Sequence, residues 1–379
     1  MKAPILVTML FKFIKWPVLI TLTALFSAMI GLHLHKMHIK VKTSISSPIG
    51  ISSLEKIILG GQEQWIFVRG MDQTNPVLLF LHGGPGEPAL GISSARHTDK
   101  ELIKHFTVVH WDQLGAGKSY HKKIPASSMS MDNWLADCNE LIDHLRARFN
   151  TRKIVLVAHS GGTILGLKIA QLYPDKIEAY VGISQIVNSF KQLSISYDWV
   201  VQEAKLKGTS NTQNKIKAIG FPPYDTPEKE YKTARFIIQY GGFIHNNPMK
   251  GLSFIVTKYL SSPEYSLTDG INTLLGKGLK FTMNTRYEEI KHIDFTREIS
   301  TISTPVYFLQ GKYDMITPTS LIEQYYQRLN AENGKELIIF ENSAHNPSME
   351  ENSLYQDILI HRLKEDFHLD ESKSSLLVH

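Results

Sequence analysis

Residues 153–162, with the sequence KIVLVAHSGG, decide the fold class. The run 154–158 is rich in β-branched and aliphatic residues, which predicts a fully buried strand. The next four residues, 159–162, interrupt that run, and residues 163–172 then have the apolar spacing of a helix. A strand, a sharp turn with a serine at its tip and a helix together predict a nucleophile elbow. Such an elbow presents the hydroxyl of Ser160 at the carboxyl edge of a sheet and directs the helix N-terminus at the same point.

The elbow also requires small residues two positions before and two after the serine, because the strand and helix backbones nearly touch there. Gly162 satisfies this rule, and Ala158 departs from it by one methyl group. The alternative is an ordinary strand-to-helix turn in which Ser160 caps the helix. The remaining sequence has to decide between these two interpretations.

The composition of the 379-residue chain is that of an ordinary globular protein, and its length allows one large α/β domain with an insertion, or two domains. The net charge of +5 is explained by residues 1–42, which carry six lysines and no acidic residue. The rest is close to neutral, which excludes the concentrated basic face of a nucleic-acid-binding protein. Cys138 is the only cysteine, so the chain has no internal disulfide and no cysteine-based metal site.

The amino-terminal residues 1–42 predict a membrane anchor with basic flanks. Residues 17–34 are almost entirely apolar, and about eighteen such residues are just enough to cross a bilayer as a helix. A cleaved signal peptide is one alternative, because its apolar core is usually shorter and ends in small residues such as Ser27 and Ala28. A buried core helix is a third interpretation, which is disfavoured because the segment is apolar on every face. Lysines on both sides leave the orientation open by charge bias. Residues 43–53, which contain serine, glycine and proline, are predicted to be a linker.

Residues 54–184 have the pattern of the first part of an α/β core. A hairpin is expected across Gly60-Gly61, and buried strands are expected at 77–81, 106–111, 154–158 and 177–184, with a helix at 130–149. The strand at 77–81 ends in the sequence HGGPG, whose glycines allow the backbone to point N–H groups outward. We expect the N–H groups of Gly84 and Gly161 to form an oxyanion hole.

Residues 185–300 have a different character, because buried strand runs give way to helical segments separated by glycine and proline. A stretch of that length is too long for a connection within a sheet. It therefore predicts a helical cap inserted over the active site. The core resumes in residues 301–370, with strands expected at 305–310 and 337–340, a helix at 319–329 and a closing helix at 350–367.

Three polar residues follow predicted parallel strands and converge on one edge of the sheet: Ser160, Asp314 and His345. Their order along the chain is that of an α/β-hydrolase triad. In that arrangement His345 accepts the proton of Ser160, and Asp314 orients the imidazole. Asp294 is an alternative acid, but it lies in the predicted cap and follows no sheet strand.

The motifs HGGPG, WDQLGAGKS, AHSGG, GKYD and SAH resemble the proline iminopeptidase-like branch of the α/β-hydrolase superfamily. The resemblance covers residues from about 54 to 366. It implies the α/β-hydrolase fold, with a mostly parallel sheet of about eight strands flanked by helices and a helical cap before the acid strand. It also implies that no metal or organic cofactor is needed.

The sequence departs from the family pattern in three places. Leu114 stands where the family has arginine in the WDQLGAGKS segment. Gly161 follows the serine where a bulky residue is usual, which predicts extra room beside the oxyanion hole. The cap lacks the tryptophan-glutamate pair with which iminopeptidases bind the substrate amine, although Trp199 and Glu203 lie four residues apart.

We therefore expect substrate contacts from Gly83, His159, Trp199 and Glu203, with Glu228, Glu230 and Glu264 as further carboxylates that can bind an amine. The expected function is that of a serine hydrolase that forms an acyl-enzyme, with aminopeptidase activity on small peptides. The alternatives are an esterase or amidase acting on a small acyl substrate, and a non-catalytic binding protein of the same fold. The expected location is the membrane, with an extracytoplasmic catalytic domain.

Overall fold

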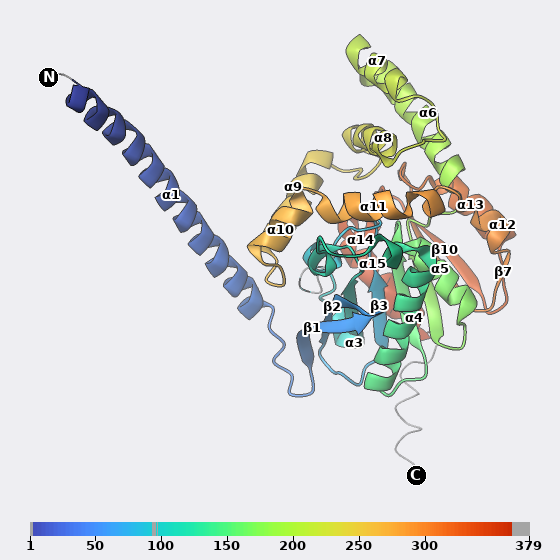
Figure 1. Cartoon of the computed structure of the whole chain (residues 1–379). Helices are drawn as coiled ribbons and strands as arrows, with labels where there is room; N and C mark the ends of the chain where they lie inside the picture. The colour runs from blue at the N-terminus through green and yellow to red at the C-terminus, as the bar shows by residue number, and fades with distance from the viewer. Residues whose placement is uncertain (1–2, 93–95, 97, 366–379) are drawn as a thin grey trace. The chain divides into compact units, whose positions relative to one another are not determined.

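The computed structural model describes residues 3–92, 96 and 98–365 (Figure 1). The chain divides into two compact units, one of Met1–Ser44 with Ser261–Pro263 and one of Ile45–Leu260 with Glu264–His379. The end of the predicted core, residues 366–370, and the last residues of the predicted closing helix lie outside the described residues.

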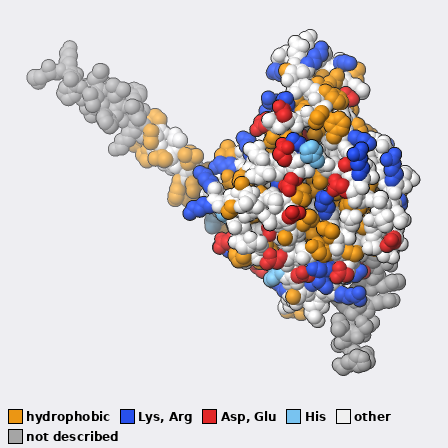
Figure 2. Space-filling model, turned by 45° about the vertical axis from the view of Figure 1, so that its right-hand side comes forward, with side chains coloured by type: hydrophobic (Ala, Val, Ile, Leu, Met, Phe, Trp, Pro, Cys, Tyr) orange, Lys and Arg blue, Asp and Glu red, His pale blue; other side chains and the backbone are white. Residues whose placement is uncertain are grey.

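The amino-terminal unit consists mainly of helix α1 (Ala3–Lys42), which is longer than the predicted 17–34. Its segment Trp16–Lys42 has a mean hydropathy of 1.8 and is the one helix among the described residues that is long and apolar enough to cross a membrane. Exposed hydrophobic side chains are frequent between Trp16 and Val41, on the part of this helix that Figure 2 colours. Length and composition alone make α1 a candidate membrane span or signal sequence.

The second unit is built on a sheet of eight strands, as predicted. In spatial order they are β1 (Ile51–Leu59), β2 (Gln62–Gly70), β4 (Thr107–Asp112), β3 (Val77–Leu81), β5 (Ile154–His159), β6 (Ile177–Ile183), β8 (Val306–Gly311) and β10 (Lys335–Phe340). Strands β1 and β2, and strands β2 and β4, pair antiparallel, and every other pair is parallel. Two short strands, β7 (Thr301–Ile302) and β9 (Asn330–Ala331), pair outside this sheet.

Helices cover both faces of the sheet (Figure 1). One hydrophobic cluster joins the strands to α4 (Met131–Arg148), α5 (Gly162–Leu172) and α13 (Thr319–Arg328). The cluster on the other face contains residues of α3 (Leu102–His105) and α15 (Asn352–Glu365). Strands buried on both faces consist of continuous apolar runs, and this is why β3 and β5 were recognisable from sequence.

The strand register brings the chemistry-bearing turns to one edge. Leu81 pairs with Ala158, Ala158 with Gly182, and Ile183 with Leu309, so the four central parallel strands end at similar heights. The loops that follow them start at the same edge of the sheet. Ligands in open parallel sheets bind at this carboxyl edge.

Residues 185–300 are helical between β6 and β7. The helices are α6 (Ser189–Lys207), α7 (Ser210–Ile219), α8 (Pro227–Tyr240), α9 (Pro248–Ser261), α10 (Leu267–Leu274), α11 (Lys277–Ile290) and α12 (Phe295–Glu298). Helix α11 packs directly on the loop that follows β4, because a Cβ on Gly115 would lie 2.7 Å from Thr282 Oγ1. Leu114, which replaces the arginine usual in the family, is buried against Phe281 of the same helix.

The predicted linker is shorter than expected, because β1 begins at Ile51, inside residues 43–53. Ile51, Ser52 and Ser53 pair with residues 68–70 of β2. The sequence suggested a linker because serines and a glycine dominate it. An edge strand, however, needs only one apolar face, and residues along β1 alternate between partly buried and exposed.

Candidate active site

The serine lies at a strained turn between β5 and α5. The backbone of Ser160 has a φ of 51°, a left-handed conformation that is unfavourable for a residue with a side chain. A Cβ added to Gly162 would lie 2.4 Å from the carbonyl oxygen of His82, so only glycine fits there. These are the features expected of a nucleophile elbow.

Ala158 keeps its extra methyl group because the facing position on α5 is also a glycine. A Cβ on Gly166 would lie 2.8 Å from the Cβ of Ala158. The strand and the helix can therefore approach as closely as in a G-x-S-x-G elbow. The glycine at residue 166 therefore compensates for the extra methyl group of Ala158.

The prediction of extra space beside Gly161 is wrong. A Cβ at this position would lie 2.4 Å from the carbonyl oxygen of Gly84 and 2.6 Å from its carbonyl carbon. The backbone of the HGGPG loop fills the space that a side chain at residue 161 would occupy. Gly161 is thus a steric requirement of this loop conformation.

Ser160, His345 and Asp314 form a continuous chain of hydrogen bonds, although 31 residues separate the last two and 185 separate the first two. The distance from Ser160 Oγ to His345 Nε2 is 2.8 Å, and the distance from His345 Nδ1 to Asp314 Oδ2 is 2.9 Å. The three residues are 8%, 2% and 0% exposed. With Nδ1–H donating to the carboxylate, Nε2 is the lone-pair nitrogen that faces the serine hydroxyl.

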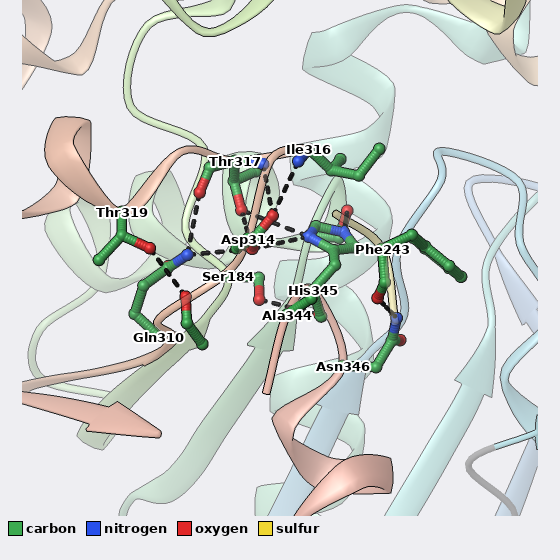
Figure 3. A network of polar contacts seen from close by, with 12 residues as sticks. Ser184, Phe243, Gln310, Asp314, Ile316, Thr317, Thr319, Ala344, His345 and Asn346 are labelled. Carbon is green, nitrogen blue, oxygen red and sulfur yellow. Dashed lines mark hydrogen bonds and ion pairs between the residues drawn. The ribbon is translucent and has the colours of Figure 1, made fainter. Parts of the chain in front are cut away.

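The carboxylate of Asp314 is held by the turn that follows β8 (Figure 3). Its Oδ1 accepts hydrogen bonds from the backbone N–H groups of Ile316 and Thr317, and its Oδ2 accepts from the Thr317 hydroxyl at 2.6 Å and from the Gln310 amide at 3.0 Å. Burial raises the pKa of the Asp314 carboxyl, but His345 and the hydrogen bonds from Thr317 outweigh burial and lower it below its ordinary value. The acid is therefore ionised at neutral pH.

The loop that carries His345 is fixed through its backbone. The carbonyl oxygen of His345 accepts hydrogen bonds from His159 Nε2 and from the Ser184 hydroxyl, both at 2.9 Å. The N–H of His345 donates to the carbonyl of Phe243, and the side-chain amide of Asn346 donates to the same oxygen. Residue 243 belongs to the helical insertion, so this segment helps to hold the histidine (Figure 3).

Sequence reasoning missed Glu350, which ties the same two segments together. One carboxylate oxygen accepts the N–H of Ala344 at 2.8 Å, and the other accepts the N–H of His245 at 2.6 Å. Burial raises the pKa of this carboxyl, although the backbone hydrogen bonds oppose the shift. Its sequence signal is weak, since a glutamate near the start of a closing helix is common.

The HGGPG loop is anchored to the segment after β4. His82 Nδ1 donates to the carbonyl of Gly83 at 2.9 Å, and its Nε2 accepts the N–H of Gln113 at 3.1 Å. Burial lowers the pKa of His82 to about 3, so the ring is neutral and this arrangement is stable at ordinary pH. Within the part of the chain that the structure describes, the N–H groups of Gly83, Gly84 and Gly161 have no acceptor.

Asp112 is a second residue that the sequence alone did not identify as structurally central. Its carboxylate accepts hydrogen bonds from the N–H groups of Ala89 and Lys118 at 2.8 Å and from the hydroxyl of Tyr265. These contacts join the end of the HGGPG loop, the turn after β4 and the helical insertion. Burial raises the pKa of Asp112 to about 6, and the backbone hydrogen bonds oppose this shift.

The predicted substrate contacts fall into two groups. Gly83 and His159 lie beside the serine, because the position of a Cβ on Gly83 is 3.0 Å from Ser160 Cβ and 3.3 Å from His159 Nδ1. Trp199 packs instead in a cluster of the helical insertion that includes Met315. Glu203 is paired with Lys207 of its own helix at 2.5 Å.

The other predicted carboxylates are also engaged elsewhere or exposed. Glu264 forms a buried ion pair of 2.7 Å with Arg96, and burial raises the pKa of the Glu230 carboxyl to about 7. Glu228 is exposed, and the alternative acid Asp294 caps helix α12 through Thr296. The described residues contain no group of three or more His, Cys, Asp and Glu side chains placed to hold a metal ion.

A family profile for the α/β-hydrolase fold matches residues 76–216. The chain is 36% identical over 311 residues to a probable aminopeptidase, YbaC, of Bacillus subtilis strain 168, covering 82% of this chain and 95% of that protein. The chain belongs to the proline iminopeptidase-like branch of the α/β hydrolases. The predicted family, the predicted fold and the assignment as a hydrolase enzyme are thereby confirmed.

Other relatives of this hydrolase agree with that assignment. A proline iminopeptidase of Heyndrickxia coagulans is 26% identical, with 75% of this chain and 88% of that protein covered. Among solved structures, a proline iminopeptidase of Mycobacterium smegmatis superposes with a TM-score of 0.61 at 15% identity, covering 83% of this chain and 98% of that chain. At that identity the likeness supports the fold alone.

Proposed function

We propose that this protein is an aminopeptidase-type serine hydrolase in which Ser160 is the nucleophile, His345 the general base and Asp314 the orienting acid. The observation that carries the proposal is the hydrogen-bond chain of 2.8 Å and 2.9 Å through the three side chains at the carboxyl edge of the sheet. The relationship to a probable aminopeptidase supports the choice of reaction. The substrates are then small peptides or aminoacyl amides.

The first half of the reaction forms an acyl-enzyme. Ser160 Oγ attacks the scissile carbonyl carbon while its proton moves to His345 Nε2. Asp314 stabilises the imidazolium that forms, since its carboxylate already accepts the Nδ1–H. His345 then protonates the departing amine, and the acyl group stays on Ser160.

The negative oxygen of the tetrahedral intermediate needs donors that are already in place. The N–H groups of Gly84 and Gly161 are proposed for this role, because neither has an acceptor among the described residues. Water then attacks the acyl-enzyme, with His345 again as the base, and the serine is released. The whole sequence uses side chains and backbone groups of this chain.

The direct test is covalent labelling of the full-length protein with a fluorophosphonate, which reacts with activated serines. The wild type should be modified on Ser160, and the Ser160→Ala variant should not be labelled although it folds normally. Hydrolysis of proline and other aminoacyl anilides, compared with 4-nitrophenyl esters, then separates the peptidase from the esterase. A folded wild-type protein that stays unlabelled contradicts the proposal.

We also propose that residues 185–300 act as a cap over the site and that α1 is an uncleaved anchor with the catalytic domain outside the cytoplasm. The cap is supported by the hydrogen bond from the N–H of His345 to the carbonyl of Phe243 and by the one from the N–H of His245 to Glu350. The anchor is supported by the apolar length of Trp16–Lys42. Lysines before and after the apolar core give little charge bias, so orientation needs an experiment.

The native cysteine makes that experiment simple. Cys138 is buried and is the only cysteine, so it reacts poorly with a membrane-impermeant maleimide. A cysteine introduced at exposed Lys122 should be labelled in intact cells if the domain lies outside the cytoplasm, and only after lysis if it lies inside. The anchored protein should also remain in membranes after a carbonate wash and keep its amino-terminal residues.

A further inference from the structure

Glu87 lies beside the proposed nucleophile, at the end of the HGGPGE turn. The N–H of Glu87 donates to the carbonyl of Gly83 at 3.3 Å, which folds the turn back on itself. The position of a Cβ on Gly83 is 3.2 Å from Glu87 Oε2 and 3.0 Å from Ser160 Cβ. A carboxylate oxygen and the serine side chain therefore border the same small space.

This carboxylate has no partner within the described residues. No hydrogen bond or ion pair of the Glu87 side chain occurs among them. Glu87 also lines a pocket with His159, Phe243 and Asn346. An unpaired carboxylate in a pocket is costly, and a bound cation or hydrogen-bond donor is the usual compensation.

His159 presents a second acceptor to the same space. Its Nε2 faces the carbonyl oxygen of His345 at 2.9 Å, and a carbonyl only accepts, so Nε2 carries the proton. Its Nδ1 is then a lone pair, and it lies 3.3 Å from the position of a Gly83 Cβ. Burial lowers the pKa of His159 to about 4, and the nearby His345 contributes to this shift, so the ring is neutral at pH 7.

We infer that Glu87 and His159 form a subsite for the protonated α-amine of the substrate, next to Ser160. The inference rests on the proposed function and assigns its specificity to substrates with a free amino terminus. In an aminoacyl substrate one carbon atom separates the amine from the carbonyl that the serine attacks. The subsite for the amine must therefore lie immediately beside the nucleophile, where these two acceptors are.

An ammonium group suits this pair of acceptors. It has three N–H donors and a positive charge, so it can donate to Glu87 Oε2 and to His159 Nδ1 at once. Burial raises the pKa of the Glu87 carboxyl, with His345 opposing the shift, and a bound cation would favour the ionised form. The nitrogen of an N-acylated substrate carries no positive charge, so such a substrate leaves the Glu87 carboxylate unpaired.

The carboxylates predicted from the cap are less suited to this role. Glu203 is paired with Lys207, and Glu264 is paired with Arg96 in a buried ion pair. Glu87 was not a candidate from sequence, because it lies in the loop after β3 and not in the cap. The turn that places it beside Ser160 is visible only in three dimensions.

Two phosphonates that differ only in the amine test the inference on the full-length protein. Diphenyl 1-aminoethylphosphonate carries the α-amine, and diphenyl ethylphosphonate lacks it. In both cases Ser160 Oγ forms a bond to phosphorus, one phenoxide leaves, and the serine proton passes to His345. The wild type should be inactivated at least about 30-fold faster by the amine probe, as expected for a desolvated charge pair.

The variant Glu87→Gln should lose that preference, so that the two probes react within about threefold of each other, and the loss should fall mainly on the amine probe. Glu87→Asp keeps a carboxylate on a shorter stem and should retain part of the preference. Glu341→Gln, which changes an exposed carboxylate paired with Lys312, is the matched control and should keep the wild-type ratio. The uncharged probe also reports whether each variant has a folded site.

The outcomes separate this inference from the proposed function. A wild type with no preference for the amine probe overturns the inference, and so does a Glu87→Gln variant that keeps the preference or slows both probes equally. Labelling of Ser160 by a fluorophosphonate in those cases leaves the proposed function standing. A folded protein that no serine-directed probe modifies removes the proposed function itself.

Discussion

The carboxylate of Glu350 accepts the backbone N–H of Ala344 at 2.8 Å, directly before the histidine of the hydrogen-bond chain. Its other oxygen accepts the N–H of His245 from the helical insertion. A Glu350→Gln variant places an amide donor against one of these N–H groups. We expect a loss of about 1–3 kcal/mol in the free energy of unfolding, because a buried N–H loses its acceptor.

The same variant should lower kcat for aminoacyl anilides by about tenfold, since the loop of His345 is less firmly placed. Urea unfolding and steady-state kinetics on the same preparation measure both effects. Glu323→Gln, at an exposed position on α13, is the control and should change neither. Wild-type stability and kcat in Glu350→Gln would show that the carboxylate is not needed to hold the loop.

Gly161 offers a steric test of the oxyanion loop. An alanine there would place its Cβ 2.4 Å from the carbonyl oxygen of Gly84, so the loop has to move. Because loss of one oxyanion-hole donor typically costs about 100-fold or more, we expect Gly161→Ala to lower kcat by roughly that factor.

The matched substitution is Gly270→Ala on α10, where the nearest atoms would lie 3.6 Å from the new Cβ. It should leave kcat unchanged. If Gly161→Ala were fully active, the loop would have to be free to withdraw, and the steric argument would fail.

Asp314 links catalysis to acid stability. Asp314→Asn should lower kcat by about 10⁴-fold, as in other triads, because an amide favours the wrong tautomer of the histidine. The pKa of Asp314 lies below its ordinary value, so its carboxylate stabilises the fold above that ordinary value, and this contribution disappears as the pH falls through the lowered pKa.

The difference in unfolding free energy between wild type and Asp314→Asn should therefore shrink as the pH is lowered from about 7 to about 3. Urea titrations at several pH values measure it. A difference that stays constant over this range would mean that the pKa of the folded protein is not lowered.

Glu230 should behave in the opposite way. Burial raises the pKa of this carboxyl to about 7, and the neighbouring Tyr287 opposes the shift. Between its ordinary value of 4.5 and about 7 the folded protein binds more protons than the unfolded chain, so stability falls as the pH rises. Glu230→Gln mimics the neutral acid and should stabilise the protein relative to wild type at pH 8 but not at about pH 4.

Thermal unfolding of the wild type and Glu230→Gln at the two pH values checks this expectation. Equal shifts at both values would exclude ionisation as the cause. The variant should also keep its preference for substrates with a free amine, because the amine subsite is inferred at Glu87 and His159.

The central strands and the three residues of the hydrogen-bond chain were readable from sequence for a simple reason. Parallel strands buried on both faces are continuous apolar runs, and β3 was predicted with the same bounds that it has in the structure. The residues that follow such strands must meet at one edge, which brings Ser160, Asp314 and His345 together. The resemblance to the family motifs supported the assignment of these three residues to a triad.

What the sequence could not give are contacts that depend on how loops fold across one another. Glu350 accepts a hydrogen bond from a residue that is far from it along the chain, and Glu87 is brought beside Ser160 by a tight turn. No local sequence pattern marks either residue. The space beside Gly161 was predicted to be open, because a missing side chain suggests room. The carbonyl of Gly84, which occupies that room, belongs to a loop about eighty residues earlier.

The contact between Ala158 and Gly166 has a consequence for anyone who transplants this motif. Residue 158 can carry a methyl group only because residue 166 carries none, since the two Cβ atoms would otherwise lie 2.8 Å apart. A graft of AHSGG into another hydrolase has to bring the glycine of the following helix with it. Ala158→Gly alone should not make Gly166→Ala tolerable, because the new Cβ would still lie 2.7 Å from Cε2 of the buried Tyr180, so the glycine at residue 166 is required by two neighbours at once.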